Sequence, residues 1–144
     1  MSQYKTILLA TDLSDEAEQV ADKASTLAKA NGASLHLVHV IEPLSFAYGG
    51  DIPMDFSGIQ QEIQKQAETQ MEEFAARVGA GSDCQHIIIG RAENEIHNLA
   101  EHLSVDLIVV GSHGRHGIAL LLGSTANGVL HGASCDVLAI RVGE

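Results

Sequence analysis

Basic side chains are scarce in this sequence, which has 8 lysines and arginines against 19 aspartates and glutamates, a formal net charge of −11. Proteins that bind nucleic acids need a basic surface, so we expect no DNA or RNA partner. The acidity by itself indicates little more than good solubility. It does not exclude a small anionic ligand, because backbone N–H groups can hold a phosphate without net positive charge.

Cysteines and long apolar runs are also few. Cys84 and Cys135 lie far apart and form no CxxC pair, which excludes sulfur-rich metal or redox motifs and indicates two reduced thiols. No apolar stretch approaches the roughly 20 residues that a membrane span needs, so we expect no membrane insertion. The N-terminal stretch MSQYKTILLATD reaches Asp12 too soon for a signal peptide. The sequence therefore predicts a cytoplasmic protein.

Several catalytic and phosphate-binding motifs are missing. No GxGxxG follows the first predicted strand and no GxxxxGK[ST] occurs, which excludes a dinucleotide fingerprint and a P-loop. There is no GxSxG elbow, and Ser112 and His113 are merely neighbours in the chain, which does not make a catalytic triad. No pair of carboxylates is marked out for acid–base chemistry. The sequence therefore predicts no catalytic residue.

Short apolar runs alternate with amphipathic segments along the whole chain. The apolar runs predict strands at Lys5–Thr11, Ala33–Val40, Cys84–Ile89, Val105–Val110 and Asp136–Val142. Apolar residues at helical spacing predict helices around Ala17–Ala28, Ile59–Val78, Ile96–Leu103 and Ala126–Ala133. Strands that are apolar throughout and alternate with helices are typical of a parallel sheet covered on both faces. We therefore predict a single α/β domain spanning residues 1–144.

The segment Glu42–Ser57 interrupts this alternation. It holds both prolines, the pair Gly49-Gly50 and three of the five aromatic residues. A loop of this length in a compact domain is often a lid or a contact surface, and an ordinary connecting loop is the alternative.

Ligands of an open parallel sheet bind beyond the carboxyl ends of the strands. The first strand ends in ATDLS, Ala10–Ser14, and the fourth in VVGSHGRHG, Val109–Gly117, whose glycines allow backbone N–H groups to approach an anion. Gly123-Ser124-Thr125 then resembles a helix N-terminus, where free N–H groups favour phosphate. Two such elements suit a ligand with linked phosphates, and a structural glycine loop followed by a helix cap is the alternative.

Several individual polar residues near these stretches have more than one interpretation. Asp12 suits a hydrogen-bond acceptor for a ribose or base, a carboxylate near a metal–phosphate, or a helix cap. Arg115 suits a phosphate partner or a surface residue. His113 and His116 have no third ligand nearby in sequence, so we predict no metal site. The other histidines show no ligand spacing and are interpreted as surface or strand residues: His36, His39, His86, His97, His102 and His131.

Taken together, these stretches resemble the universal stress protein family. The resemblance is carried by ILLATDLS (Ile7–Ser14), LHLVHV (Leu35–Val40), VDLIVVGSHGRHG (Val105–Gly117), LLGST (Leu121–Thr125) and CDVLAIRV (Cys135–Val142). It implies an open five-stranded parallel sheet of order 3-2-1-4-5, the adenine nucleotide alpha hydrolase-like fold. In that order the first and fourth strands are neighbours, which would bring Asp12 near Gly111.

The family contains members that bind adenine nucleotides, with the pattern G-x2-G-x9-G-[ST], and members that do not. This chain has Gly111-x2-Gly114 and Gly123-Ser124, with eight residues between them in place of nine. The resemblance therefore implies bound AMP, ADP or ATP, with Mg²⁺ only beside ATP. The shorter connection would favour AMP or ADP over ATP.

The resemblance also implies which residues touch the nucleotide. Adenine and ribose would be surrounded by Ala10, Thr11, Asp12 and Val40. Ribose and phosphate would be wrapped by Gly111, Ser112, His113, Gly114 and Arg115, with Val110 counted among the contacts. Donors to the phosphate would come from Gly123, Ser124 and Thr125. Family members commonly dimerise through the last strand, here Val137–Val142, and an exposed apolar edge strand favours such pairing.

The leading hypothesis is thus a cytoplasmic, dimeric stress-response protein that binds an adenine nucleotide and regulates an unidentified partner protein without fast turnover. A slow ATPase or phosphotransferase is one alternative, although no general base is evident and Arg115 is the one candidate arginine finger. A protein-interaction module of the same fold with an empty site is the other.

Overall fold

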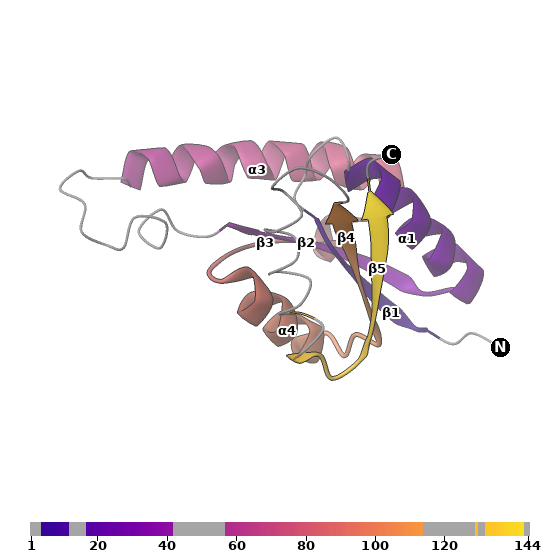
Figure 1. Cartoon of the computed structure of the whole chain (residues 1–144). Helices are drawn as coiled ribbons and strands as arrows, with labels where there is room; N and C mark the ends of the chain where they lie inside the picture. Colours follow the sequence, from indigo (N-terminus) through magenta and orange to yellow (C-terminus); the bar gives the residue numbers. More distant parts are fainter. Residues whose placement is uncertain (1–3, 12–16, 42–56, 114–128, 130–131, 143–144) are drawn as a thin grey trace.

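Five parallel strands form one sheet in the order β3-β2-β1-β4-β5 (Figure 1). The strands are β1 (Thr6–Ala10), β2 (Ser34–Ile41), β3 (Gln85–Ile89), β4 (Leu107–His113) and β5 (Asp136–Val142). The computed structural model describes residues 4–11, 17–41, 57–113, 129 and 132–142. The predicted parallel α/β fold and its strand order are confirmed.

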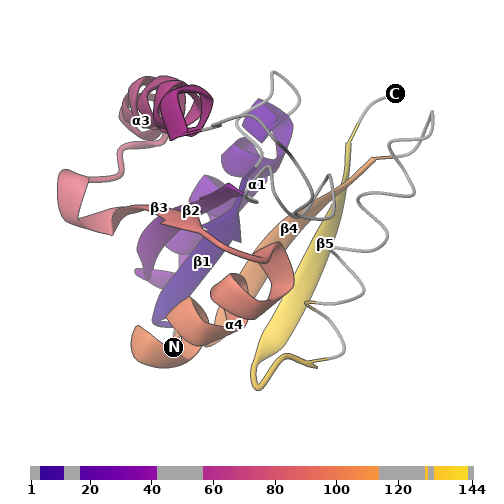
Figure 2. The same cartoon turned by 90° about the vertical axis from the view of Figure 1, so that its left-hand side faces the viewer.

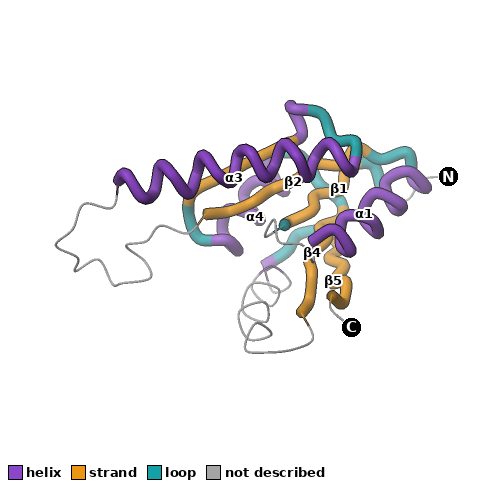
Figure 3. The backbone as a smooth tube through the Cα atoms, turned by 90° about the horizontal axis from the view of Figure 1, so that it is seen from above, coloured by secondary structure: helices purple, strands orange, loops and turns teal. Residues whose placement is uncertain are grey.

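Helices lie on both faces of this sheet (Figure 2). The described helices are α1 (Ala17–Asn31), α3 (Ser57–Val78) and α4 (Ala92–His102), together with the short 3₁₀ turn η1 (Ser82–Cys84). Seen from above, α1 and α3 lie over the strands, whereas α4 lies on the opposite side (Figure 3). The first two helices both end at a glycine with positive φ, Gly32 at 64° and Gly79 at 78°. Glycine reaches this left-handed conformation without strain, so it stops each helix cleanly.

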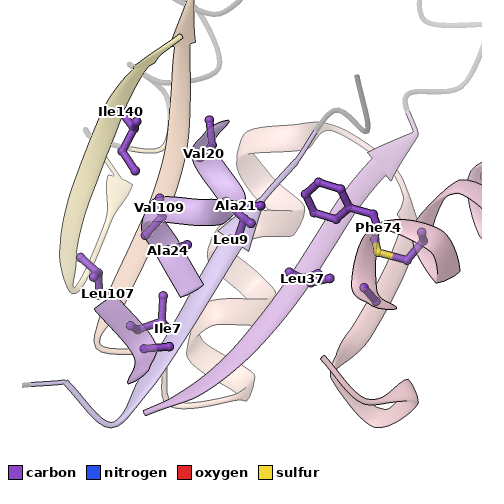
Figure 4. Packing of buried hydrophobic residues seen from close by; sticks show 13 residues of the cluster. Ile7, Leu9, Val20, Ala21, Ala24, Leu37, Phe74, Leu107, Val109 and Ile140 are labelled. Atoms are coloured by element: carbon purple, nitrogen blue, oxygen red, sulfur yellow. The ribbon is translucent and has the colours of Figure 1, made fainter. Parts of the chain in front are cut away.

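Successive residues along a strand belong alternately to two separate hydrophobic clusters, one on each face of the sheet. Odd-numbered residues of β1, β2 and β4 pack against α1 and α3 (Figure 4): Ile7, Leu9, Leu37, Leu107 and Val109. Even-numbered residues pack against α4: Leu8, Val38, Ile108 and Val110. A strand exposes successive side chains on opposite faces, so a sheet buried on both faces needs apolar residues throughout. This requirement explains the continuous apolar runs of the sequence.

Several predicted element boundaries differ from the structure by one to four residues, and two of the differences have a clear local cause. The fourth strand was predicted to stop at Val110, but β4 continues to His113 because Gly111, Ser112 and His113 pair with Ile140, Arg141 and Val142 of β5. Pairing with a neighbouring strand overrides the weak strand preference of glycine and serine. The third strand begins one residue later than predicted, because Cys84 closes the turn η1.

Two other predicted elements lie mostly outside the described residues. Of the segment Glu42–Ser57, the structure describes Ser57, which is the first residue of α3. Of the helix predicted around Ala126–Ala133, it describes Val129 and Gly132 as helical, and Ala133 as following the helix.

Candidate functional site

The two central strands separate at their carboxyl ends. β1 pairs with β4 over three residues, ending at Leu9 opposite Val109. Beyond this point β1 follows β2, with Ala10 opposite Val38, while β4 follows β5 as far as His113 opposite Val142. This is the switch point of the sheet, since the chain passes from β1 to β2 on one side and from β4 to β5 on the other. Open α/β sheets bind their ligands at such points.

The β1 side of this opening is held by β2. The backbone N–H of Thr11 donates to the carbonyl of Val38 at 2.9 Å, and Nδ1 of His39 lies 2.9 Å from the carbonyl oxygen of Thr11. A carbonyl can only accept a hydrogen bond, so Nδ1 of His39 carries the proton. Thr11 is only 9% exposed. Both backbone polar groups of Thr11, the residue that follows β1, are therefore held by β2.

Three of the predicted contacts share one face at this edge. Ala10 and Val40 are half-buried and pack on the cluster beneath α4, and Val110 of β4 is buried in the same cluster. They come from three adjacent strands and form a small aliphatic surface at the carboxyl end. Val110 is only 3% exposed, so what it offers to a ligand is its backbone.

The β4 side consists of extended backbone rather than a loop. Gly111, Ser112 and His113 were expected to wrap a ligand as part of a glycine loop, yet all three belong to β4. The reason is their pairing with β5, which holds them straight. The remaining predicted contacts lie outside the described residues: Asp12, Gly114, Arg115, Gly123, Ser124 and Thr125.

Val129, four positions after Thr125 in the sequence, is tied to α4. Nε2 of His97 donates to the carbonyl of Val129 at 2.8 Å, and Val129 is fully buried. A Cβ atom added to Gly132 would overlap the imidazole of His97. The absence of a side chain at Gly132 thus makes room for this hydrogen bond.

Histidines are the residues whose roles the sequence reasoning missed. His39 and His97 had been interpreted as surface or strand residues, but each donates to a backbone carbonyl near the switch point or the segment after it. For His39 the sequence did offer an indication, since this polar side chain lies within the otherwise apolar strand LHLVHV, immediately before Val40. A polar side chain that is partly buried in an apolar strand needs a hydrogen-bond partner, although the sequence does not say which residue supplies it.

A further pair of histidines joins β2 to β3. Nδ1 of His36 and Nε2 of His86 are 3.1 Å apart, and the ring centroids are 5.3 Å apart. Burial lowers the pKa of His86, and the positive charges of His36 and of His102 on α4 lower it further. Within the described part of the chain, no group of three or more histidine, cysteine, aspartate or glutamate side chains is placed to hold a metal ion.

The two thiols are free and half-buried. Burial raises the pKa of Cys84, as does the charge of Asp83, and burial together with Asp136 raises the pKa of Cys135. A raised pKa leaves less of the reactive thiolate at neutral pH, so neither cysteine resembles an activated nucleophile. Among the helices that the structure describes, none has the length and apolarity to cross a membrane.

A family model described as the universal stress protein family matches residues 3–141. The chain belongs to the universal stress protein family. It is 45% identical to universal stress protein A homolog 1 of Coxiella burnetii over 143 residues, which cover 98% of this chain and 99% of that protein. It is 43% identical to homolog 2 of the same organism over 146 residues, covering 99% and 98%. Family membership supports a general role in the response to stress.

Solved structures of other universal stress proteins share this fold. One, crystallised in complex with cAMP, superposes with a TM-score of 0.70 and covers 97% of this chain and 98% of its own, at 23% identity. Similarity at this level of identity establishes the fold, and the fold agrees with the strand order described above.

Proposed function

We propose that this universal stress protein binds an adenine nucleotide where β1 and β4 separate, and that the bound nucleotide governs its action on a partner protein in the cytoplasm during stress. The observation that carries the proposal is the switch point itself. β1 and β4 stop pairing at Leu9 and Val109, and the chain beyond them continues into Asp12 and into the glycine motif. The cAMP bound by one universal stress protein of the same fold is also an adenine nucleotide.

The residues at this edge fit a purine nucleoside. The aliphatic side chains of Ala10 and Val40 lie on one face and suit the flat apolar ring. In the proposed site adenine and ribose contact Ala10, Thr11, Asp12 and Val40. Ribose and phosphate contact Val110, Gly111, Ser112, His113, Gly114 and Arg115. The phosphate also accepts from Gly123, Ser124 and Thr125.

The nucleotide is AMP, ADP or ATP in this proposal, and Mg²⁺ accompanies ATP alone. Gly114 and Gly123 are separated by eight residues, one fewer than in the nucleotide-binding pattern, and a shorter connection favours fewer phosphates. A bound nucleotide would act here as a signal rather than as a substrate in fast turnover. Within the described residues, the opening carries no carboxylate placed to act as a general base on a phosphate.

A second copy of the chain is the proposed partner at the outer edge of the sheet. β5 is an edge strand, and its residues Leu138 and Ala139 are exposed. Unpaired backbone groups beside exposed apolar side chains favour strand-to-strand association. We propose a homodimer formed through Val137–Val142.

Nucleotide identification tests this function directly. Freshly purified protein is denatured, and the released small molecules are separated and identified by mass spectrometry, while calorimetry measures the binding of AMP, ADP and ATP. We expect a stoichiometric adenine nucleotide or micromolar binding. A folded protein that releases no nucleotide and binds none of the three contradicts the proposal.

A double substitution provides the matched comparison. Gly114→Glu with Gly123→Val places a negative charge and a side chain where the phosphate is proposed to lie, and should abolish binding. Gly58→Glu introduces the same charge at an exposed glycine with open space around its Cβ position, and should leave binding unchanged. Equal loss of binding in both proteins would point to a general charge effect. Hydrolysis of ATP above the level of the double variant would favour the slow ATPase instead.

A further inference from the structure

The peptide that leaves β1 at the switch point is fixed by a side chain of β2. Thr11 donates its N–H to the carbonyl of Val38 at 2.9 Å, which continues the backbone pairing between the strands. Its carbonyl oxygen lies 2.9 Å from Nδ1 of His39, the very next residue of β2. Two consecutive residues of β2 thus hold both backbone polar groups of Thr11, the residue that follows β1.

We call these two hydrogen bonds to Thr11 the clamp. The clamp lies beyond the point where β1 stops pairing with β4. β4 pairs with β1 no further than Leu9, so the backbone of Thr11 is supported from the β2 side. Thr11 is buried, with only 9% of its surface exposed. A buried backbone outside a regular strand is stable only when its N–H and C=O groups have hydrogen-bond partners. His39 supplies that pairing for the carbonyl. The residue that follows Thr11 is Asp12, which is the carboxylate in the proposed nucleotide site.

We propose that His39 is a positioning residue for the nucleotide site. By holding the Thr11 carbonyl, it fixes the backbone of Thr11, which is itself one of the proposed contacts to adenine and ribose. A site that is already ordered loses less conformational entropy on binding and so binds more tightly. This inference rests on the proposed function, because positioning has a consequence for affinity only if a nucleotide binds there.

The protonation of His39 follows from the same contact. The hydrogen bond needs a proton on Nδ1, so the neutral ring is the Nδ1–H tautomer and Nε2 carries the lone pair. Addition of a second proton at Nε2 leaves the Nδ1–H donor in place. The clamp is therefore retained in both charge states of the imidazole.

Three substitutions separate the donor from the bulk of the ring. His39→Asn keeps an N–H donor at the same number of bonds from Cα, so it should recover near wild-type affinity. His39→Leu keeps a comparable volume without a donor, and His39→Gln moves the donor one bond further out. Loss of one hydrogen bond corresponds to about three- to tenfold weaker binding, which we expect for both of these. His36→Leu is the matched control: the same substitution three residues earlier on β2, at a histidine bonded to His86.

A spectroscopic measurement on the nucleotide-free protein tests the clamp without any ligand. Nitrogen-15 NMR of the imidazoles should show a protonated Nδ1 for His39, with a scalar coupling across the hydrogen bond to the carbonyl carbon of Thr11. His39 in the Nε2–H tautomer, or with no such coupling, would refute the clamp even if every histidine variant were unstable.

The binding experiment keeps the two proposals apart. If the wild-type protein binds no nucleotide, the proposed function fails and the positioning role fails with it. If the wild-type protein binds and folded His39→Leu and His39→Gln bind with the same affinity, the positioning role alone is overturned. Weaker binding in these two, recovery in His39→Asn and no effect in His36→Leu together support it.

Discussion

Asp106 and Thr6 are joined by two hydrogen bonds that run in opposite directions. The N–H of Thr6 donates to Oδ1 of Asp106 at 3.0 Å, and the N–H of Asp106 donates to the carbonyl of Thr6 at 3.0 Å. The other carboxylate oxygen of Asp106 accepts from the N–H of Lys5 at 2.9 Å. One aspartate just before β4 therefore fastens the start of β1, at the end of the sheet opposite the switch point.

Removal of this carboxylate should destabilise the central strands. Asp106→Ala leaves the N–H groups of Lys5 and Thr6 without their acceptor, and hydrogen bonds to a charged group are stronger than neutral ones. We expect a loss of about 2 kcal/mol in the free energy of unfolding, measured with urea. Asp106→Asn keeps one acceptor oxygen and should lose less. Glu68→Ala, on the exposed face of α3, serves as the control. Coincident urea curves for Asp106→Ala and the wild type would show that the fastening contributes nothing.

Acidification should destabilise the contact between β2 and β3. Burial and the charges of His36 and His102 lower the pKa of His86 below its ordinary value of about 6.5. The unfolded chain then binds more protons than the folded one, so this contribution is fully present above about pH 6.5. It is lost as the pH falls from there through the lowered pKa of the folded state. Charging both rings would also break the bond between His36 and His86.

The pH effect is measured as the urea midpoint between pH 8 and pH 5, compared with His86→Gln. The variant has no titrating group at this position, so its midpoint should vary less over the range. A variant whose midpoint falls as steeply as that of the wild type would assign the acid sensitivity to other groups.

Gly132 and His97 should behave as a coupled pair. An alanine at Gly132 would overlap the imidazole of His97 and displace it from the carbonyl of Val129. We expect Gly132→Ala to destabilise the protein by about 1–3 kcal/mol, the range for a buried polar group that loses its partner. His97→Ala removes the same hydrogen bond but leaves room for the new methyl group.

The double variant, Gly132→Ala with His97→Ala, tests whether the two residues are coupled. Its loss of stability should be smaller than the sum of the two single losses, because the second change removes no bond that the first has left intact. Gly58→Ala, where the new methyl meets open space, should not destabilise. Strict additivity of the two changes would mean that Gly132 and His97 act independently.

The proposed dimer can be tested at the exposed apolar residues. Leu138 on β5 is 37% exposed, and a charge there should oppose its copy across a paired edge. We expect Leu138→Glu to shift the protein from dimer to monomer in light scattering after size exclusion. Ile59→Glu makes the same change at a residue of α3 that is 46% exposed, and should leave the dimer intact. A Leu138→Glu protein that remains dimeric would exclude β5 as the interface.

The alternation of strands and helices could be predicted because each strand is buried on both faces. A short apolar run such as KTILLAT has few interpretations once an amphipathic helix follows it. The extension of β4 through Gly111, Ser112 and His113 could not be predicted in the same way, since those residues are extended because β5 lies beside them. The residues around Gly111 do not indicate that β5 is the neighbouring strand.

The histidine contacts were missed for the same reason. His39 and Thr11 are 28 positions apart, and His36 and His86 are 50 apart, so no spacing rule relates them. Ala10, Thr11, Val40, Val110 and Gly111 do lie at the edge where the sequence led us to expect a site. Their contact with a nucleotide remains a prediction, as does that of the contacts outside the described residues: Asp12, Gly114, Arg115, Gly123, Ser124 and Thr125.

The short pairing between β1 and β4 divides the sheet into two ribbons. One ribbon is β3-β2-β1 and the other is β4-β5, whose strands pair along their full seven residues, from Leu107 to His113. The seam between the ribbons is fastened at one end by Asp106 and open at the other. β4 borders both the open end and β5, because Gly111, Ser112 and His113 pair with Ile140, Arg141 and Val142. The centre of the sheet and its outer edge are therefore only one strand apart.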